Sequence, residues 1–384
     1  MNSTKTLSLM KYLINSPSLS SLEKKYVNDV LKSTWLSSNG KHTLEFEKKV
    51  CKFLNVKNAL AVQSGTAALH LALKTLGCKN GDKVVIPNYS CSSNLTSVIQ
   101  CGAIPIIVEV EKTSLGLDVN LLKKAIKIYK PKIVQLVHVY GFPAKDTFEI
   151  KQICKKNKIL LLEDFSEALG AKINNRKLGT FGDIGIFSIR SEKMIGVGEG
   201  GVIVTNNVSL YKKAEKLGSR NSPFRGKKDP YWKKYHCLGE GYNYKLPHLL
   251  GAIGRGQIER FEKEILPKKI KIGKIYKNIF DDENFKITQY YPKTHKPVFW
   301  LNSIYFKNIT RNKVRRIGLE LQKKGIEVRS GFWPLNLVKN VNSKYVYEKK
   351  ISKNIYENTL VLPSNTNLTR KDIKYIKQII LNYI

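Results

Sequence analysis

Lys193 lies in a glycine-rich stretch, FSIRSEKMIGVGEGGVIVTN (187–206), between two apolar runs that are typical of strands. The glycines permit a tight turn that presents the lysine. A lysine can act as a nucleophile only when it loses its proton, which requires a partly desolvated position or cationic neighbours. The stretch therefore predicts either a chemically active lysine or an ordinary surface loop with a solvated one.

A second candidate is Asp164, at the end of the apolar run ILLLED (159–164). A carboxylate at the carboxyl edge of a buried parallel strand lies where α/β proteins bind ligands. Burying such a charge without a partner costs several kcal/mol. We therefore expect Asp164 to have a cationic partner or to lie at a solvated edge, although an aspartate before a helix is also a common cap.

A third candidate is the Ser-Gly-Thr turn in QSGTAALHLAL (63–73), which joins a predicted strand to a predicted helix. Thr66 is a natural helix N-cap, and Gly65 lets the backbone approach a ligand closely. The free N–H groups at such a helix start bind phosphate. Alone, the turn indicates no more than a capped helix, because every capped helix begins in this way.

Together, a phosphate site, an aspartate at a sheet edge and a loop lysine match the needs of pyridoxal 5′-phosphate (PLP). This cofactor uses a lysine for its Schiff base, an acidic partner for its ring nitrogen and a site for its phosphate. The aspartate keeps the pyridinium protonated, so that the ring can accept electrons from a substrate carbanion. The order and spacing of the three groups indicate PLP more strongly than any one of them.

From residue 58 onward, short β-rich runs alternate with helical stretches. This alternation, with several continuous apolar runs, predicts an α/β fold with a mostly parallel sheet. We expect a large domain over residues 1–260, whose N-terminal segment packs on a smaller α+β domain over 261–384. The predicted strands cover residues 58–62, 83–88, 104–110, 132–139, 159–164, 184–189 and 201–206.

The chain of 384 residues carries 67 Lys and Arg against 30 Asp and Glu, a net charge of +37. These basic residues are spread along the whole length without a nucleic-acid motif, which favours a solvated surface over a nucleic-acid site. Such a surface attracts small anions by long-range steering. No apolar run reaches the length of a bilayer, we recognise no signal peptide, and the six cysteines form no CxxC pair. We expect a cytoplasmic protein without a membrane partner.

The sequence resembles the DegT/DnrJ/EryC1/StrS family of nucleotide-sugar aminotransferases over nearly its whole length. The resemblance implies a PLP-dependent sugar aminotransferase. It also implies the type I fold of PLP-dependent transferases, that of aspartate aminotransferase, with a mostly parallel, seven-stranded sheet in the large domain. The motifs that carry it include QSGTAALHLAL, GAIPIIVEVE, VHVYGFPA, LLEDFSEALGA, LGTFGDIGIFS, EKMIGVGEGGVIVTN, LGEGYNYKLPHLLGAIGRGQIER, FWLNSIYF and GIEVRSGFWPL.

The resemblance also implies roles for individual residues. Lys193 would form the Schiff base and carry protons, and Asp164 would pair with the pyridine nitrogen. Glu167 falls where the family carries His, Gln or Glu near the cofactor. Family members are homodimers with shared active sites, and the GYNYKL loop would serve the partner subunit. Further implied contacts are those of Gly65, Thr66, Ser188 and, in the partner's site, Asn243 with the PLP phosphate, and those of Arg329 and Trp333 with the substrate.

Three positions depart from the family pattern. Cys91 stands where an aromatic residue usually stacks on the PLP ring, so either Tyr89 takes that role or the stacking is weaker. A free cysteine at that face is more often a small apolar residue than a reactive one. Lys245, also expected on the substrate side, replaces an arginine and keeps its charge without the bidentate fork. Asn336 replaces a histidine of the C-terminal motif.

The implied reaction is transamination. Sugar dehydratases of the same family carry histidine in place of the Schiff-base lysine, so Lys193 favours an aminotransferase, with L-glutamate as the donor expected from the family. Relatives that aminate C4 often carry Glu or His at the position of Glu167, whereas those that act at C3 often carry Gln. The segments DPYW (229–232) and FWLNS (299–303) resemble perosamine-synthase-type enzymes. We therefore expect a GDP-perosamine-synthase-like enzyme that aminates C4 of a nucleotide-linked 4-keto-6-deoxy sugar. Alternatives are amination at C3, a PLP-dependent dehydratase, and a nucleic-acid-binding or regulatory protein on the same scaffold.

Overall fold

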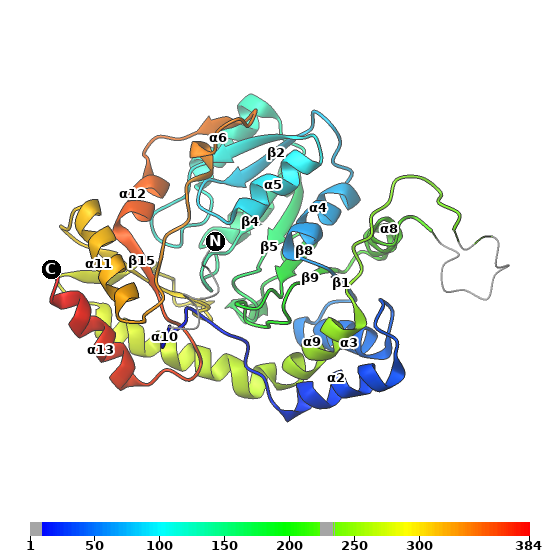
Figure 1. Cartoon of the computed structure of the whole chain (residues 1–384). Helices are drawn as coiled ribbons and strands as arrows, with labels where there is room; N and C mark the ends of the chain where they lie inside the picture. Colours follow the sequence, from blue (N-terminus) through cyan, green and yellow to red (C-terminus); the bar gives the residue numbers. More distant parts are fainter. Residues whose placement is uncertain (1–9, 223–232, 234) are drawn as a thin grey trace.

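The structure, a computed structural model, describes residues 10–222, 233 and 235–384 (Figure 1). At its centre is an 8-stranded sheet with the strand order β1-β9-β8-β5-β4-β2-β3-β14. Neighbouring strands from β8 to β14 run parallel, whereas β9 is antiparallel to both β1 and β8. The strands are β1 (Asn58–Val62), β2 (Lys83–Pro87), β3 (Ile104–Val108), β4 (Ile133–Val137), β5 (Leu160–Asp164), β8 (Ile184–Ser188), β9 (Gly201–Thr205) and β14 (Lys344–Val346).

Both faces of this sheet are covered by helices, so its strands are apolar on both sides. Successive side chains of a strand point to opposite faces. In β2, Val84 and Ile86 pack in one apolar cluster and Val85 in another. The first cluster is completed by α4 (Gly65–Thr75), α5 (Ser92–Gln100) and α8 (Val208–Gly218), and the second by α6 (Val119–Tyr129) and α7 (Thr147–Lys156).

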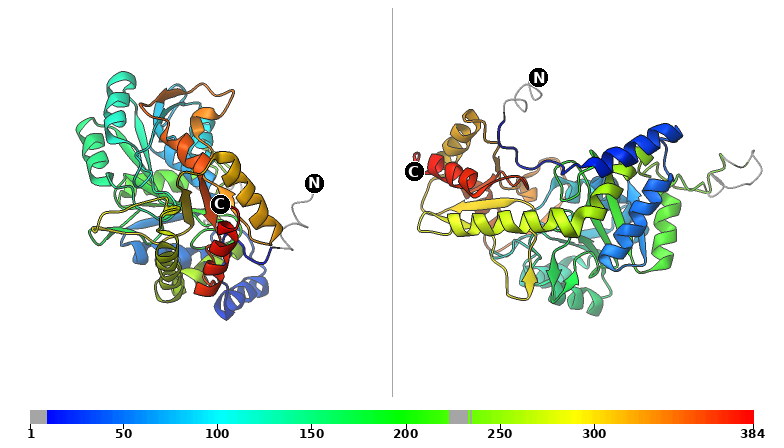
Figure 2. Two further views of the ribbon diagram at one scale, coloured as in Figure 1. Left: turned by 90° about the vertical axis from the view of Figure 1, so that its left-hand side faces the viewer. Right: turned by 90° about the horizontal axis from the view of Figure 1, so that it is seen from below.

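A long helical run connects the central sheet with the C-terminal part of the chain. It consists of α9 (His248–Arg260), the π-helical turn η2 (Phe261–Ile265) and α10 (Leu266–Phe280). At its start, α9 packs against α2 (Ser21–Ser33) and α3 (Lys41–Leu54). The view from below in Figure 2 shows the run leading from α2 and α3 to the C-terminal elements.

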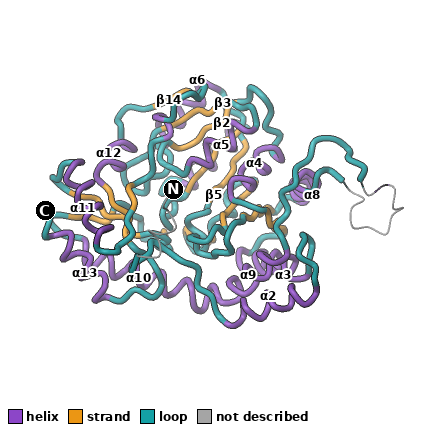
Figure 3. The backbone as a smooth tube through the Cα atoms, viewed as in Figure 1, coloured by secondary structure: helices purple, strands orange, loops and turns teal. Residues whose placement is uncertain are grey.

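The C-terminal part is built on a 4-stranded antiparallel sheet of order β10-β12-β15-β13. Its core is formed with α10, α11 and α13, whose apolar residues pack on β12 and β15. Figure 3 shows these strands apart from those of the central sheet. The elements are β10 (Phe285–Ile287), β12 (Asn302–Phe306), α11 (Arg311–Lys323), β13 (Arg329–Ser330), η3 (Leu335–Leu337), α12 (Ile351–Asn358), β15 (Thr359–Leu362) and α13 (Arg370–Leu381), with a 3-stranded sheet of β11 (His295–Lys296), β6 (Lys172–Ile173) and β7 (Arg176–Lys177).

The N-terminal segment lies against the C-terminal part. Tyr12 N donates to Gly325 O at 3.0 Å, and Ser364 N donates to Ile14 O at 2.7 Å. The division of the chain into domains at residue 260 stays a prediction, and that residue ends α9 where the helix passes into η2.

The expected α/β fold with a mostly parallel sheet is confirmed, and all seven predicted strands lie in the central sheet. The eighth strand, β14, comes from the C-terminal part and pairs with β3, Lys344 lying opposite Ile106. Strand β14 was not predicted, because three residues without a continuous apolar run are typical of a loop. In the described part of the chain, no helix combines the length and apolar character that a membrane span requires.

Candidate active site

A cavity of about 570 Å³ lies at the carboxyl edge of the central sheet, facing the second sheet. Segments that follow β1, β2, β4, β5 and β8 line one side, and segments around Trp300 and Arg329 line the other. This is the edge at which α/β sheets bind ligands. The predicted residues that line the cavity are Gly65, Thr66, Cys91, Asp164, Glu167, Ser188, Lys193, Arg329 and Trp333.

Lys193 lies in the loop between β8 and β9, with its amine turned into the cavity. Nζ lies 3.2 Å from Oε1 of Glu167 and 3.7 Å from the centroid of the Trp300 ring. The side chain is 11% exposed, in contrast to a solvated surface lysine. The structure therefore agrees with the partly desolvated position that a nucleophilic lysine requires.

The lysine loop is held by its own turns and by α9. Lys193 N donates to Arg190 O at 2.8 Å, and Ser191 N donates to Gly198 O at 2.9 Å. Gly198 has a φ of 109°, a conformation that residues with a side chain rarely adopt. The glycine cluster thus serves the close turn that the sequence predicted.

Asp164, the last residue of β5, is buried at the cavity wall. Oδ2 accepts a hydrogen bond from Asn94 Nδ2 at 2.9 Å, and Oδ1 accepts one from Ser166 N at 2.9 Å. Asn94 is itself oriented by Gln135 Oε1, which accepts from the same Nδ2 at 2.9 Å. Within the described residues Asp164 has no ion-pair partner, so its expected cation is not supplied by the described chain.

The turn after β1 differs from the prediction in its cap. The N-cap of α4 is Ser64, whose Oγ accepts a hydrogen bond from Ala67 N at 3.0 Å, and the predicted cap at Thr66 is wrong. Ser64 has the extended backbone of a cap, whereas Thr66 already lies inside the helix. A Cβ on Gly65 would lie 2.8 Å from Cβ of Ser188, so the two predicted phosphate-binding positions meet directly.

Glu167 links the lysine to the backbone after β4. Oε2 accepts a hydrogen bond from Tyr140 N at 2.9 Å, while Oε1 pairs with Lys193. Burial raises the pKa of the Glu167 carboxyl, an effect that the nearby Lys193 ammonium opposes and the Asp164 carboxylate reinforces. The carboxylate therefore lies close enough to orient the Lys193 amine within the cavity.

Cys91 lines the cavity, as predicted, and its Sγ accepts from Ser93 Oγ at 2.9 Å. Tyr89 lies elsewhere. Its ring is fully buried and its hydroxyl lies 3.3 Å from that of Tyr140. A Cβ on Gly331 would be 2.3 Å from the same hydroxyl, so Tyr89 is enclosed behind the cavity wall. Tyr89 therefore does not line the cavity, and the alternative in which it stacks on the cofactor has no support in the structure.

Arg329 and Trp333 form part of the wall opposite the sheet. Arg329 pairs with Glu192 through Nη1 and with Glu327 through Nη2, both at 2.8 Å. Trp333 is half-exposed and packs edge-to-face on Tyr356 at 5.1 Å. Both side chains line the cavity, and their contacts with a substrate remain a prediction.

Asn243 and Lys245 lie outside this cavity. They line a separate hollow of about 950 Å³, where Lys245 Nζ donates to Asn39 Oδ1 at 3.0 Å. Trp35 and Leu36 line the same hollow and are 56% and 50% exposed. Asn243 and Lys245 therefore do not reach the cavity of their own chain. Their contribution to the active site of a partner subunit stays a prediction.

Sequence reasoning missed the roles of Asn94 and Trp300. Asn94 is fully buried behind Asp164, and the polar run after the second strand was its only signal. Trp300 belongs to the FWLNSIYF motif. This motif contributed to the family resemblance, but no role was predicted for the tryptophan. The DPYW segment lies outside the described residues.

The residues present fit PLP. Asp164 faces the cavity with neutral hydrogen-bond partners only, which suits the protonated nitrogen of a pyridine ring. The close approach of Gly65 to Ser188 forms a cradle that a Cβ would fill, next to the N-terminus of α4. Lys193 completes the set with an amine inside the same cavity.

The profile of the DegT/DnrJ/EryC1/StrS aminotransferase family matches residues 17–381. The chain belongs to this family. It is 35% identical to GDP-perosamine synthase of Vibrio cholerae, over 96% of this chain and 98% of that protein, and 34% identical to GDP-perosamine synthase of Escherichia coli O157:H7, over 96% and 97%. The structure of Helicobacter pylori PseC, an aminotransferase involved in the biosynthesis of pseudoaminic acid, superimposes with a TM-score of 0.87 at 25% identity, over 97% of this chain and 98% of that one.

The family match confirms three expectations. The chain is a PLP-dependent sugar aminotransferase, it has the fold of that family, and its cofactor is PLP. The roles of the individual site residues are not tested by the match.

Proposed function

We propose that the enzyme transfers an amino group from L-glutamate to C4 of a GDP-linked 4-keto-6-deoxyhexose, as a GDP-perosamine synthase does. The observation that carries the proposal is the lysine amine of Lys193, 3.2 Å from Glu167 inside the cavity. A histidine at this position would favour the dehydratases of the family. The names of the relatives from V. cholerae and E. coli support the GDP-linked substrate.

Each residue of the cavity has a proposed task. When bound, PLP supplies a carbonyl that condenses with amines and a ring that takes up electrons. Lys193 Nζ would hold the cofactor and then move a proton from Cα of the donor, while Glu167 Oε1 orients that amine. Asp164 would keep a proton on the ring nitrogen. The N–H groups of Gly65 and Thr66, with the hydroxyl of Ser188, would bind the phosphate.

The substrate side is proposed from the opposite wall and from a second copy of the chain. Arg329 offers a guanidinium beside the cavity, and Trp333 offers an exposed ring face. Asn243 and Lys245 would complete the site of a partner subunit in a homodimer. The exposed apolar residues of their hollow, Trp35 and Leu36, support an interface there.

Three other functions compete with this proposal. The dehydratase and the C3-aminotransferase use the same cofactor, and they differ in the sugar product. A nucleic-acid-binding role would draw on the net charge of +37 but gives no use to the enclosed set of Asp164, Glu167 and Lys193.

The decisive experiment has two stages. Absorbance of the protein with PLP, before and after L-glutamate, should show a visible Schiff-base band that glutamate bleaches. Lys193→Ala should lack that band, whereas the exposed Lys123→Ala should retain it. Incubation with GDP-4-keto-6-deoxymannose and glutamate should then yield the 4-amino sugar by mass and NMR. A 3-deoxy product would indicate a dehydratase, and turnover of 3-keto sugars alone would refute the assignment to C4.

A further inference from the structure

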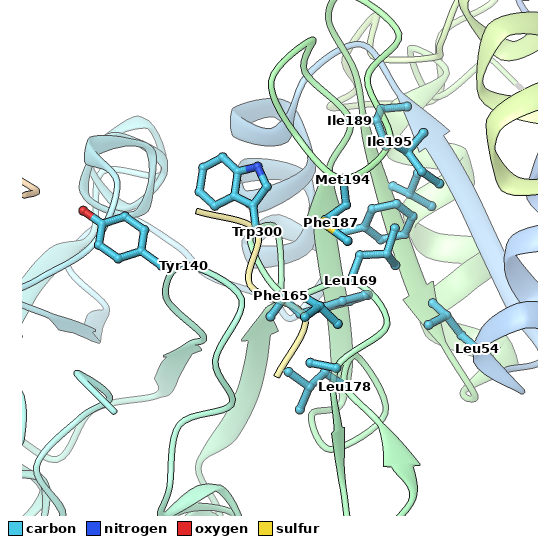
Figure 4. Close-up of a cluster of buried hydrophobic side chains, with 14 of the residues drawn as sticks. Leu54, Tyr140, Phe165, Leu169, Leu178, Phe187, Ile189, Met194, Ile195 and Trp300 are labelled. Carbon is cyan, nitrogen blue, oxygen red and sulfur yellow. The ribbon is translucent and has the colours of Figure 1, made fainter. Parts of the chain in front are cut away.

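The amine of Lys193 lies over the face of an aromatic ring. Nζ is 3.7 Å from the ring centroid of Trp300, and its other close partner is Glu167. Trp300, drawn in Figure 4 among the buried apolar side chains, is 3% exposed and lines the cavity. A cation over an indole face is stabilised most strongly where water is excluded. The contact therefore favours the charged form of this amine.

The edge of the same ring holds the backbone of the lysine loop. Trp300 Nε1 donates to Glu192 O at 2.6 Å, and Glu192 directly precedes Lys193. Asn15 Nδ2 donates to the same carbonyl at 2.7 Å. Trp300 thus contacts both the Lys193 amine and the peptide group that precedes Lys193. The two contacts together fix the backbone and the tip of the lysine side chain.

The residue before Trp300 has a strained backbone conformation. Phe299 has a φ of 52°, in the left-handed region that a bulky residue rarely adopts. Two glycines make room for this backbone segment. A Cβ on Gly141 would lie 2.4 Å from Trp300 N, and one on Gly273 would lie 2.0 Å from Cγ of Phe299. Strain of this kind is concentrated at functional sites.

A buried lysine of α10 anchors the backbone of Trp300. Lys269 is 1% exposed, and its Nζ donates to Trp300 O at 2.8 Å and to Ser364 O at 2.6 Å. It also donates at 2.9 Å to Asn15 Oδ1, so the residue that shares the Glu192 carbonyl is tied into the same network. Trp300 is therefore held at its carbonyl, at its N–H and at its ring face.

We propose that Trp300 is a positioning residue that holds the Lys193 amine at the cavity wall when the amine carries a proton and is not bound to the cofactor. The inference rests on the proposed role of Lys193 and goes beyond it. Because the ring stabilises the charged form, we expect the amine to react more slowly with an acylating reagent when Trp300 is in place than when it is removed. The other titratable groups that line the cavity are Cys91, Tyr140, Asp164, Glu167, Arg190, Glu192, Glu199 and Arg329.

The test measures the reactivity of this amine in protein freed of PLP. Competitive acetylation at a series of pH values, read by mass spectrometry, reports the acetylation rate of Lys193 relative to exposed lysines. Trp300→Phe keeps a ring face and loses the N–H, and Trp300→Leu loses both. Tyr305→Leu is the matched control, because it removes the contact of Lys286 Nζ with a ring, 4.8 Å from the centroid, on β12 and outside the cavity.

We expect the relative acetylation rate of Lys193 near neutral pH to rise roughly threefold or more in Trp300→Leu, to rise less in Trp300→Phe and to stay unchanged in Tyr305→Leu. The single-turnover rate of the PLP-loaded protein with glutamate should fall roughly tenfold or more in Trp300→Leu. An unchanged acetylation rate in Trp300→Leu, or equal changes in the Phe and Leu variants, would overturn the proposal.

Failure of the proposed function gives a different result. Borohydride reduction of the PLP-loaded wild type should fix the cofactor on Lys193, as located by peptide mass. If it is fixed on another residue, the role of Lys193 is wrong, and the acetylation result then still decides whether Trp300 holds the amine. Thermal unfolding of each variant establishes that it is folded, and Trp300→Phe, which keeps most of the ring volume, remains informative where Trp300→Leu does not fold.

Discussion

Gln257 of α9 binds both backbone polar groups of Gly196. Its Oε1 accepts a hydrogen bond from Gly196 N at 3.0 Å, and its Nε2 donates to Gly196 O at 2.6 Å. Gln257 is fully buried, so neither bond competes with water. A helix that does not line the cavity thereby fixes the loop that carries Lys193.

Replacing this side chain should destabilise the protein. Gln257→Leu leaves two buried backbone groups without partners, and we expect the free energy of unfolding to fall by about 2–4 kcal/mol. Denaturant unfolding measures the change. Gln257→Glu keeps an acceptor for Gly196 N and should lose less at a pH where the carboxylate is neutral. A midpoint equal to that of the wild type in Gln257→Leu would show that the loop is held by its own turns.

Gly65→Ala should weaken cofactor binding. The added Cβ would lie 2.8 Å from Cβ and 3.0 Å from Oγ of Ser188, which closes the cradle proposed for the phosphate. We expect the dissociation constant for PLP to rise roughly tenfold or more, equivalent to about 1.4 kcal/mol. Fluorescence titration of the protein freed of PLP measures it.

The control for this variant is Gly318→Ala in α11. There the nearest atom to an added Cβ is 3.4 Å away, and alanine is the better helix former. Its PLP affinity should equal that of the wild type. Equal affinity in Gly65→Ala would place the phosphate elsewhere.

Much of the fold and part of the cavity lining could be predicted from the sequence, for a physical reason. Strands buried on both faces are continuous apolar runs, and the polar residues that end them share one edge of the sheet. Asp164 and Lys193 could be placed by this rule alone. The cap of α4 could not, because Ser64 and Thr66 are both good caps and the close approach of Gly65 to Ser188 lies between distant segments.

The contacts within the opposite wall of the cavity escaped prediction, since they join segments far apart in the chain. The bond from Trp300 Nε1 to Glu192 O spans 108 positions, and the pair of Arg329 with Glu192 spans 137. No local periodicity reports such contacts. The resemblance to a family predicted a substrate contact for Arg329, but only the structure joined this residue to Glu192.

Asp164→Asn should slow the chemistry of the cofactor without destabilising the fold. The amide oxygen can still accept a hydrogen bond from Ser166 N or Asn94, so we expect thermal stability close to that of the wild type. The negative charge that would keep the ring nitrogen protonated is lost, and the rate of the glutamate half-reaction should fall roughly 10²-fold or more. Stopped-flow absorbance measures this rate. A rate within a few-fold of the wild type would mean that Asp164 does not contact the ring.

Glu47 of α3 should make stability depend on pH. Burial raises the pKa of its carboxyl from the usual 4.5 to about 7, although Ala61 N donates to Oε1 at 2.7 Å. Between these two values the folded state binds more protons than the unfolded state, so the free energy of unfolding falls as pH rises through this window. The contribution of Glu47 should shrink by up to about 3 kcal/mol from pH 4.5 to 7 and stay constant above.

Glu47→Gln isolates this contribution, because the amide keeps an acceptor for Ala61 N and does not titrate. Urea unfolding of both proteins at several pH values gives the difference in their free energies of unfolding. We expect the wild type to lose stability relative to Glu47→Gln as pH rises to about 7. A difference independent of pH would mean that Glu47 is solvated, with an ordinary pKa in the folded protein. Lys245 lowers the pKa of Glu47. Lys245→Met should therefore extend to higher pH the range over which the free energy of unfolding falls, and leave the lower limit of that range unchanged.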